Sequence, residues 1–170
     1  FALLNIQGDD SKLINKKVNL GLDLQGGSYL LLEIQTDSLI EDRLQDKVIP
    51  LKKALKKNNI KFSSFLVSDK EILFDIDEKN SEKFELLFFS KKDNQFNSYI
   101  DKYNTFELDL KIEKNKAKVF FSKYGVLTID NAALKQSIEI VRRRIDDVGT
   151  KEPTILQRGE KRILVELPGL

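Results

Sequence analysis

The side chains that could do chemistry in this chain of 170 residues are limited by two absences, because the sequence contains no cysteine and no histidine. Cys–His and Ser–His nucleophile pairs are therefore excluded, as are nearly all zinc sites. A hydrolase that pairs a serine with a lysine is the remaining catalytic alternative, and Ser28, beside the glycines, is its only candidate. We expect no catalytic residue, no cofactor and no metal in this chain.

Two segments resemble ligand-binding loops only in part. Residues 75–80 carry the acids of a calcium loop, but Lys79 occupies a ligand position and the sixth residue is not glycine. Residues 21–27 hold three glycines without the Lys-Ser/Thr of a phosphate loop, and a strand-like run follows them instead of a helix. We interpret the first segment as a solvated strand end. The second is predicted to be a tight turn that leads into a buried strand.

Three consecutive arginines, Arg142 to Arg144, lie near the end of a predicted helix. Basic side chains stabilise the negative end of a helix dipole, which is the ordinary interpretation. The alternative is a functional role: a nucleic-acid-binding α+β domain that uses Arg142 to Arg144 as a basic patch. The net charge of only +2, from 29 basic and 27 acidic residues, is low for such a protein. We therefore expect that this protein has no nucleic-acid partner.

The elements that must position these residues follow from hydrophobic spacing. Apolar residues recur at helical spacing in a segment that is capped by Asp37 or Ser38, is kinked or broken at Pro50 and ends at Asn58-Asn59. A second helix is predicted to be capped by Ser81. The third runs from about Asp130 to Val148, with Gly149 as its stop. Strands are predicted at 28–35, 62–67, 71–76, 106–112, 117–122, 153–157 and 162–167, with hairpins around 68–70, 113–116 and 158–160.

An internal repeat relates the two halves of this pattern. The apolar stripe at residues 44, 48, 51 and 55 recurs with the same spacing at 134, 138, 141 and 145. A strand-like run follows each stripe, at 72–76 and at 163–167. These patterns predict an α+β fold, a ferredoxin-like pseudo-repeat of βαββ units, with helices packed on one face of antiparallel sheet.

Two sequence motifs carry a resemblance to a known family. Residues 20–27, LGLDLQGG, resemble the Gly-Gly motif of the first periplasmic domain of the SecD family, which are membrane subunits of protein export. Residues 142–169, ending in RILVELPG, resemble the second signature of that domain. The motif residues are Gly21, Asp23, Leu24, Gly26, Gly27, Arg142, Arg144, Gly149, Glu152, Pro153, Gly159, Arg162, Glu166, Pro168 and Gly169.

The resemblance implies structural rather than catalytic roles for these residues. The glycine turn would set the geometry of the base of the domain, and the residues from Arg142 to Pro153 would form the corner between helix and hairpin. It also implies a subunit that works with SecF beside the SecYEG channel and uses the proton-motive force. The translocating unfolded polypeptide would be contacted through a head subdomain. The domain would lie on the periplasmic side of the bacterial inner membrane, with the full-length protein anchored in that membrane.

The predicted organisation has three parts. Residues 1–19 form a lead-in after a removed membrane helix, 20–112 form the first βαββαβ unit, and 113–170 form a second βαββ unit truncated at the junction to the head. No apolar run of about 18 residues occurs, so no segment of this sequence is predicted to span a bilayer. If the second unit is truncated, strand 162–167 or strand 117–122 is expected to be left as an unpaired edge.

Overall fold

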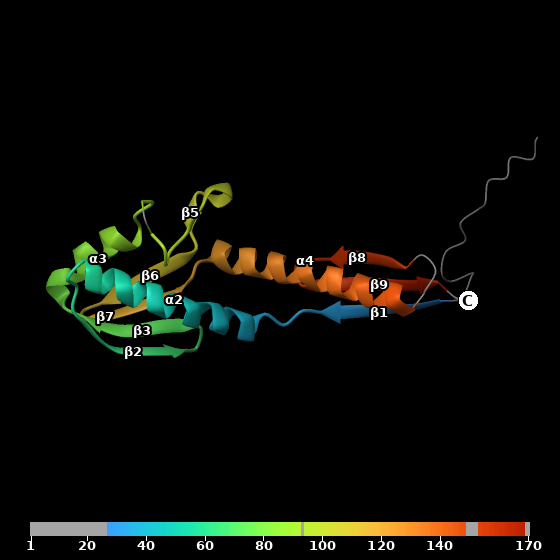
Figure 1. Ribbon diagram of the computed structural model, residues 1–170, viewed down its shortest axis with the longest axis horizontal. Coiled ribbons are helices and arrows are strands. Elements are labelled where there is room, and N and C mark those ends of the chain that lie inside the picture. The colour runs from blue at the N-terminus through green and yellow to red at the C-terminus, as the bar shows by residue number, and fades with distance from the viewer. Residues whose placement is uncertain (1–26, 93, 149–152, 169–170) are drawn as a thin grey trace, which may run out of the picture.

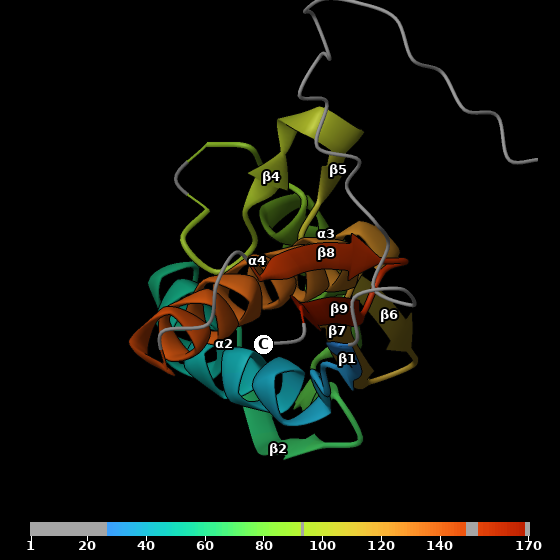
Figure 2. The same cartoon turned by 90° about the vertical axis from the view of Figure 1, so that its right-hand side faces the viewer.

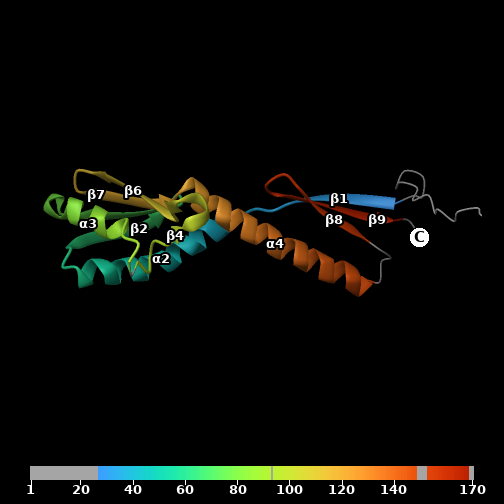
Figure 3. The ribbon, with the colours of Figure 1, turned by 90° about the horizontal axis from the view of Figure 1, so that it is seen from above.

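The computed structural model describes residues 27–92, 94–148 and 153–168. These residues form an elongated molecule with an antiparallel sheet toward each end and one long helix running between them (Figures 1 and 3). The helices are α2 (Asp37–Lys57), α3 (Ser81–Phe88) and α4 (Lys123–Val148). The strands are β1 (Gly27–Glu33), β2 (Phe62–Ser68), β3 (Glu71–Ile76), β4 (Tyr99–Ile100), β5 (Thr105–Phe106), β6 (Leu108–Glu113), β7 (Lys116–Phe121), β8 (Thr154–Arg158) and β9 (Arg162–Pro168). The predicted α+β class is confirmed.

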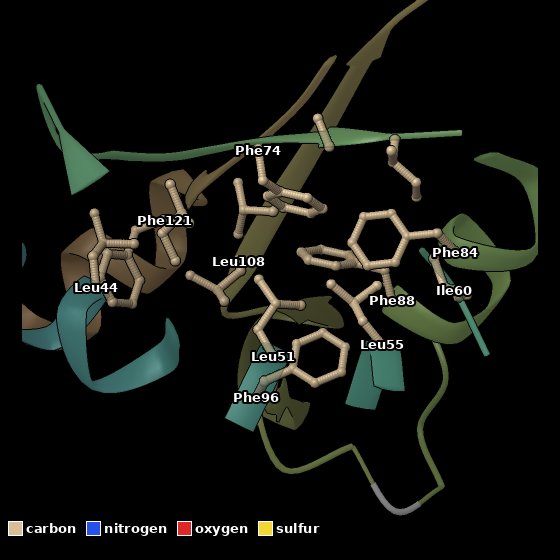
Figure 4. Close-up of a cluster of buried hydrophobic side chains, with 14 of the residues drawn as sticks. Leu44, Leu51, Leu55, Ile60, Phe74, Phe84, Phe88, Phe96, Leu108 and Phe121 are labelled. Atoms are coloured by element: carbon tan, nitrogen blue, oxygen red, sulfur yellow. The ribbon is translucent and has the colours of Figure 1, made fainter. Parts of the chain in front are cut away.

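The larger part, which we call the four-stranded unit, consists of the sheet β2-β3-β7-β6 with α2 and α3 on one face. Its core is aliphatic and aromatic (Figure 4). The predicted stripe of α2 is confirmed, since Leu44, Leu51 and Leu55 are fully buried and Val48 packs beside them. The sheet supplies alternating residues such as Ile72 and Phe74, as expected for strands with one covered face.

The smaller part, which we call the three-stranded unit, consists of the sheet β1-β9-β8 and α4 from Leu134 onward. Leu134 of α4 is buried against Ile163 and Val165 of β9. The other predicted stripe residues of this helix, Ile138, Val141 and Ile145, are partly buried around the same cluster. The two units therefore have separate hydrophobic cores. Figure 2 shows the short sheet of β4 and β5 projecting above both, and its Phe106 packs against Phe89, which follows α3.

The ferredoxin-like order of strands is not confirmed. The first strand, β1, pairs with β9 rather than with a strand of the four-stranded sheet, and β7 lies between β3 and β6. The expectation of an unpaired edge at 162–167 or 117–122 is wrong, because β9 and β7 are both central strands. The edges are β1, β8, β2 and β6. Hydrophobic alternation shows which residues share a face, but it does not identify the neighbouring strand.

Two expectations about helix caps are wrong, and helix α2 is not broken at Pro50. Helix α2 is preceded by Thr36 at the capping position, with no side-chain capping bond, and it continues through Pro50 to Lys57, with Asn58 after it as expected. The residue before α3 is Asn80, while the buried hydroxyl of Ser81 has no hydrogen-bond partner. A helix can contain a proline when burial along a whole face offsets the hydrogen bond that the proline removes. Here the buried stripe of α2 extends on both sides of Pro50.

Helix α4 begins at Lys123, seven residues before the predicted start at Asp130. The hydroxyl of Ser122 accepts a hydrogen bond from the backbone N–H of Gly125 (3.0 Å) and donates one to the carbonyl of Phe106 (2.8 Å). A serine that satisfies a free N–H in the first turn is a strong helix start. This cap outweighs the low helix propensity of Gly125 and Thr128, which had hidden the first turns. The predicted stop, Gly149, lies outside the described residues.

Candidate functional site

The strands of the two sequence motifs lie side by side in the three-stranded unit. Strand β1 begins at Gly27 of the Gly-Gly motif, and β9 holds the end of the second signature. The two strands pair from Gly27 opposite Pro168 to Glu33 opposite Arg162. Segments that are distant in the sequence therefore build one antiparallel ladder, which we take as the candidate functional region.

Not every motif residue falls within the described ranges. Gly21, Asp23, Leu24, Gly26, Gly149, Glu152 and Gly169 lie outside them. Pro153 is half-buried just before β8, and Gly159 has φ 69° in the turn between β8 and β9, which is a backbone conformation that favours glycine. Glu166 is half-buried in β9, across from Tyr29. These residues surround the ladder without forming a catalytic group.

The arginines lie on the exposed surface of α4. Arg142 donates to the carboxylate of Glu139 (2.7 Å), one helical turn away, and both side chains are about half exposed. Arg143 and Arg144 are exposed as well. A solvated pair of this kind contributes little to stability. The arrangement is that of an ordinary charged helix face.

Strand β1 was expected to be buried, and that expectation is wrong. All seven of its residues are exposed, including four large apolar side chains: Tyr29 (61%), Leu30 (52%), Leu31 (55%) and Leu32 (37%). We call these four residues the β1 apolar edge. The register places Leu30 and Leu32 on the face that α4 covers farther along the sheet, and Tyr29 and Leu31 on the opposite face. In the described part of the chain, no strand pairs with the outer side of β1.

A buried polar cluster lies where the two units meet. The hydroxyl of Thr36, just before α2, donates to the Asp130 carboxylate in α4 (2.6 Å). Lys161, in the turn between β8 and β9, donates to the Thr36 hydroxyl and lies 3.1 Å from the second oxygen of Asp130. Thr36 and Asp130 are almost fully buried, and Lys161 is partly exposed. This cluster was not predicted from the sequence, where Asp130 was interpreted only as a helix start.

Among the described residues, the ionisable groups with a shifted pKa are members of exposed ion pairs and one partly buried acid. That acid is Asp109 in β6, whose pKa is raised by burial. The Lys70 ammonium lowers the pKa of Asp37 through a solvent-exposed ion pair. Within the described ranges, no three His, Cys, Asp or Glu side chains are placed to hold a metal ion. Ser28 is exposed in β1, and no described hydrogen bond joins it to a lysine.

None of the described helices is both long enough and apolar enough to cross a membrane.

Comparison with known families finds two matches. Residues 134–170 match the family described as "Protein translocase subunit SecDF, P1 domain, N-terminal", and residues 13–38 match the "SecD/SecF GG Motif". The two matched segments contain β9 and β1, the strands that form the motif ladder.

Curated relatives extend the similarity to nearly the whole chain. Protein translocase subunit SecD of Rickettsia conorii is 35% identical over 169 residues, which is 99% of this chain and 30% of the relative. SecD of Rickettsia prowazekii is 36% identical over the same shares. SecD of Pseudomonas aeruginosa is 28% identical over 159 residues, 94% of this chain and 24% of the relative. The chain thus spans less than a third of the length of these relatives. No solved structure matches it.

Proposed function

Since the chain belongs to the SecD family of protein translocase subunits, we propose that it is a non-catalytic module of the machinery that exports proteins across the bacterial inner membrane. The observation that carries this proposal is the ladder between β1 and β9, in which the two family motifs become neighbouring strands. Paired motif strands fit a structural role, because they define the backbone of a sheet rather than a group of reactive side chains.

The proposed setting is the periplasmic side of that membrane, in a full-length protein anchored there. The proposed partners are SecF, the SecYEG channel and the translocating unfolded polypeptide. The SecD relatives are more than three times as long as this chain, so the larger share of a SecD subunit is available to form those contacts. We also propose that the motif residues, Gly27 and Arg162 among them, serve the geometry of the sheet and not catalysis.

The β1 apolar edge supports a docking role for the three-stranded unit. Among the described residues, β1 is an edge strand with no partner on its outer side and with four exposed apolar side chains, a surface that proteins normally cover. We propose that another part of the SecD subunit covers it, since the relatives are more than three times as long as this chain. A strand added beside β1 would pair with its backbone donors and acceptors, and its apolar side chains would bury Leu30 and Leu31.

The nucleic-acid alternative has no support. Its basic patch is an exposed helix face on which Arg142 is already paired with Glu139. The relatives are protein translocase subunits along nearly the whole chain.

The experiment is a chimera. This chain replaces the matching segment of Pseudomonas aeruginosa SecD in cells depleted of their own SecD. We expect the chimera to restore export, measured as the signal-peptide cleavage of a periplasmic reporter protein. The same chimera with Leu31→Lys is expected to export less, because a charge on the β1 apolar edge opposes docking. A matched change at an exposed apolar residue of the four-stranded unit, Leu86→Lys, is the control.

Two results would contradict the proposal. A chimera that accumulates to the normal level in the membrane and yet exports no reporter would contradict the proposal that this chain is a module of the export machinery. Equal export by the Leu31→Lys and Leu86→Lys chimeras would contradict docking through β1 but would leave the proposed role of the module in export intact.

A further inference from the structure

Two stretches of chain connect the two units, one within α4 and one between β1 and α2, and they lie next to each other at the junction. In α4, Ile129 packs into the core of the four-stranded unit, and Leu134 packs into the core of the three-stranded unit. In the link from β1 to α2, Ile34 packs with the three-stranded unit and Ile40 with the four-stranded unit. Each crossover is therefore only a few residues long.

The polar cluster joins these crossovers to each other. Asp130 follows Ile129 directly, and Thr36 lies between Ile34 and Ile40, two residues after the first and four before the second. The hydrogen bond from Thr36 to Asp130 (2.6 Å) thus ties one crossover to the other. Lys161 reaches both residues from the hairpin of the three-stranded unit, and its carbonyl accepts the N–H of Ile34 (2.9 Å).

Little else holds the units together. In the ranges that the structure describes, every other side-chain hydrogen bond and ion pair joins residues of the same unit or of α4 itself. The two hydrophobic clusters are separate, so no continuous apolar core crosses the junction. A groove of about 390 Å³ opens beside the cluster, lined by Ile40, Phe120 and Val126 of the four-stranded side and by Lys161.

We propose that Thr36, Asp130 and Lys161 form a latch that sets the angle between the two units. Units with separate cores and a small polar interface are free to move relative to each other unless specific contacts hold them. The bonds within the latch are strong because Thr36 and Asp130 are buried, where water competes little. The partly exposed Lys161 is the member that can leave, which opens the groove and lets the three-stranded unit rotate about the crossovers.

The test uses spin labels on cysteines placed at exposed positions of each unit, Glu85 in α3 and Thr154 in β8. The chain has no cysteine of its own, so labelling is specific. Pulsed electron paramagnetic resonance then measures the distribution of distances between the two labels. We expect one narrow distribution for the parent chain and a shifted or broadened one for Lys161→Met, Thr36→Val and Asp130→Asn. Thr36→Ser keeps the hydroxyl and is expected to retain the narrow distribution.

The control is Lys111→Met, which removes an exposed ion pair with Glu113 inside the four-stranded unit. It is expected to leave the distribution unchanged. Parent-like distributions for both Thr36→Val and Lys161→Met would overturn the latch, as would equal broadening by Lys111→Met. Circular dichroism shows whether Asp130→Asn unfolds the chain. If it does, the distance distributions of Thr36→Val and Lys161→Met decide whether the latch exists.

Discussion

Replacing Gly125 by alanine is expected to destabilise the protein by about 3 kcal/mol, the upper end for inserting a methyl group into packed surroundings. A Cβ atom at this position would overlap the carbonyl oxygen of Glu107 and lie 3.2 Å from the Phe121 ring. The Glu107 carbonyl belongs to the backbone, so it cannot rotate away as a flexible side chain could. In an open helix the same change stabilises by up to about 1 kcal/mol, so the clash decides the sign.

The carbonyl of Glu107 is also held in place from several sides. It accepts the N–H of Ser122 (2.9 Å), the N–H of Glu107 donates to Ser98 (2.8 Å), and the Glu107 carboxylate pairs with Lys47 of α2. Moving this residue to admit a side chain would therefore disturb three contacts at once. Chemical denaturation followed by circular dichroism measures the effect, since the chain has no tryptophan.

Gly159 provides the matched control. Its φ of 69° makes alanine unfavourable by about 1 kcal/mol, but no atom lies within 4 Å of the added Cβ. Gly125→Ala should thus be clearly the worse of the two. A smaller loss at Gly125 than at Gly159 would mean that α4 does not approach Glu107 as described.

The second large effect is expected at Leu51, in the middle of the α2 stripe. Truncation to alanine removes a fully buried side chain among the aromatic residues of the four-stranded core, and should cost about 2–5 kcal/mol through lost burial and the cavity left behind. Ile49 lies two residues earlier in the same helix and is 64% exposed. Ile49→Ala should change stability by no more than about 0.5 kcal/mol.

The same denaturation experiment compares these variants with Val141→Ala in α4. Val141 is only partly buried, so its truncation should cost less than that of Leu51. Equal losses at Leu51 and Ile49 would show that α2 does not bury the predicted face.

The helices and hairpins were predictable because each depends on residues close together in the sequence. The stripe from Leu44 to Leu55 defines the buried face of α2, and the turn at Asp69 and Lys70 joins β2 to β3 as expected, with both residues at positive φ. The start of α4 was missed because Gly125 weakened the helical pattern, although Ser122 carried a capping signal.

Strand pairing between distant segments could not be predicted from local pattern. The pattern of β1 reads as a buried strand in isolation, and only its position at an edge beside β9 leaves Leu30 and Leu31 exposed. The latch was hidden for the same reason. Thr36 and Asp130 are 94 positions apart, and each has an ordinary local interpretation near a helix terminus. The resemblance assigned both motifs to one domain, but it did not predict that their strands pair.

The direction in which β1 and β9 pair decides how the molecule would respond to force. Gly27 and Pro168 are opposite each other at the end of the ladder that points away from the four-stranded unit (Figure 1). Ladder hydrogen bonds run perpendicular to antiparallel strands. A pull that separates Gly27 from Pro168 therefore loads these bonds one after another, as in opening a zipper. A pull between Pro168 and the four-stranded unit instead slides the strands lengthwise and loads all the bonds together. The three-stranded unit is thus mechanically weak in one direction and strong along its long axis.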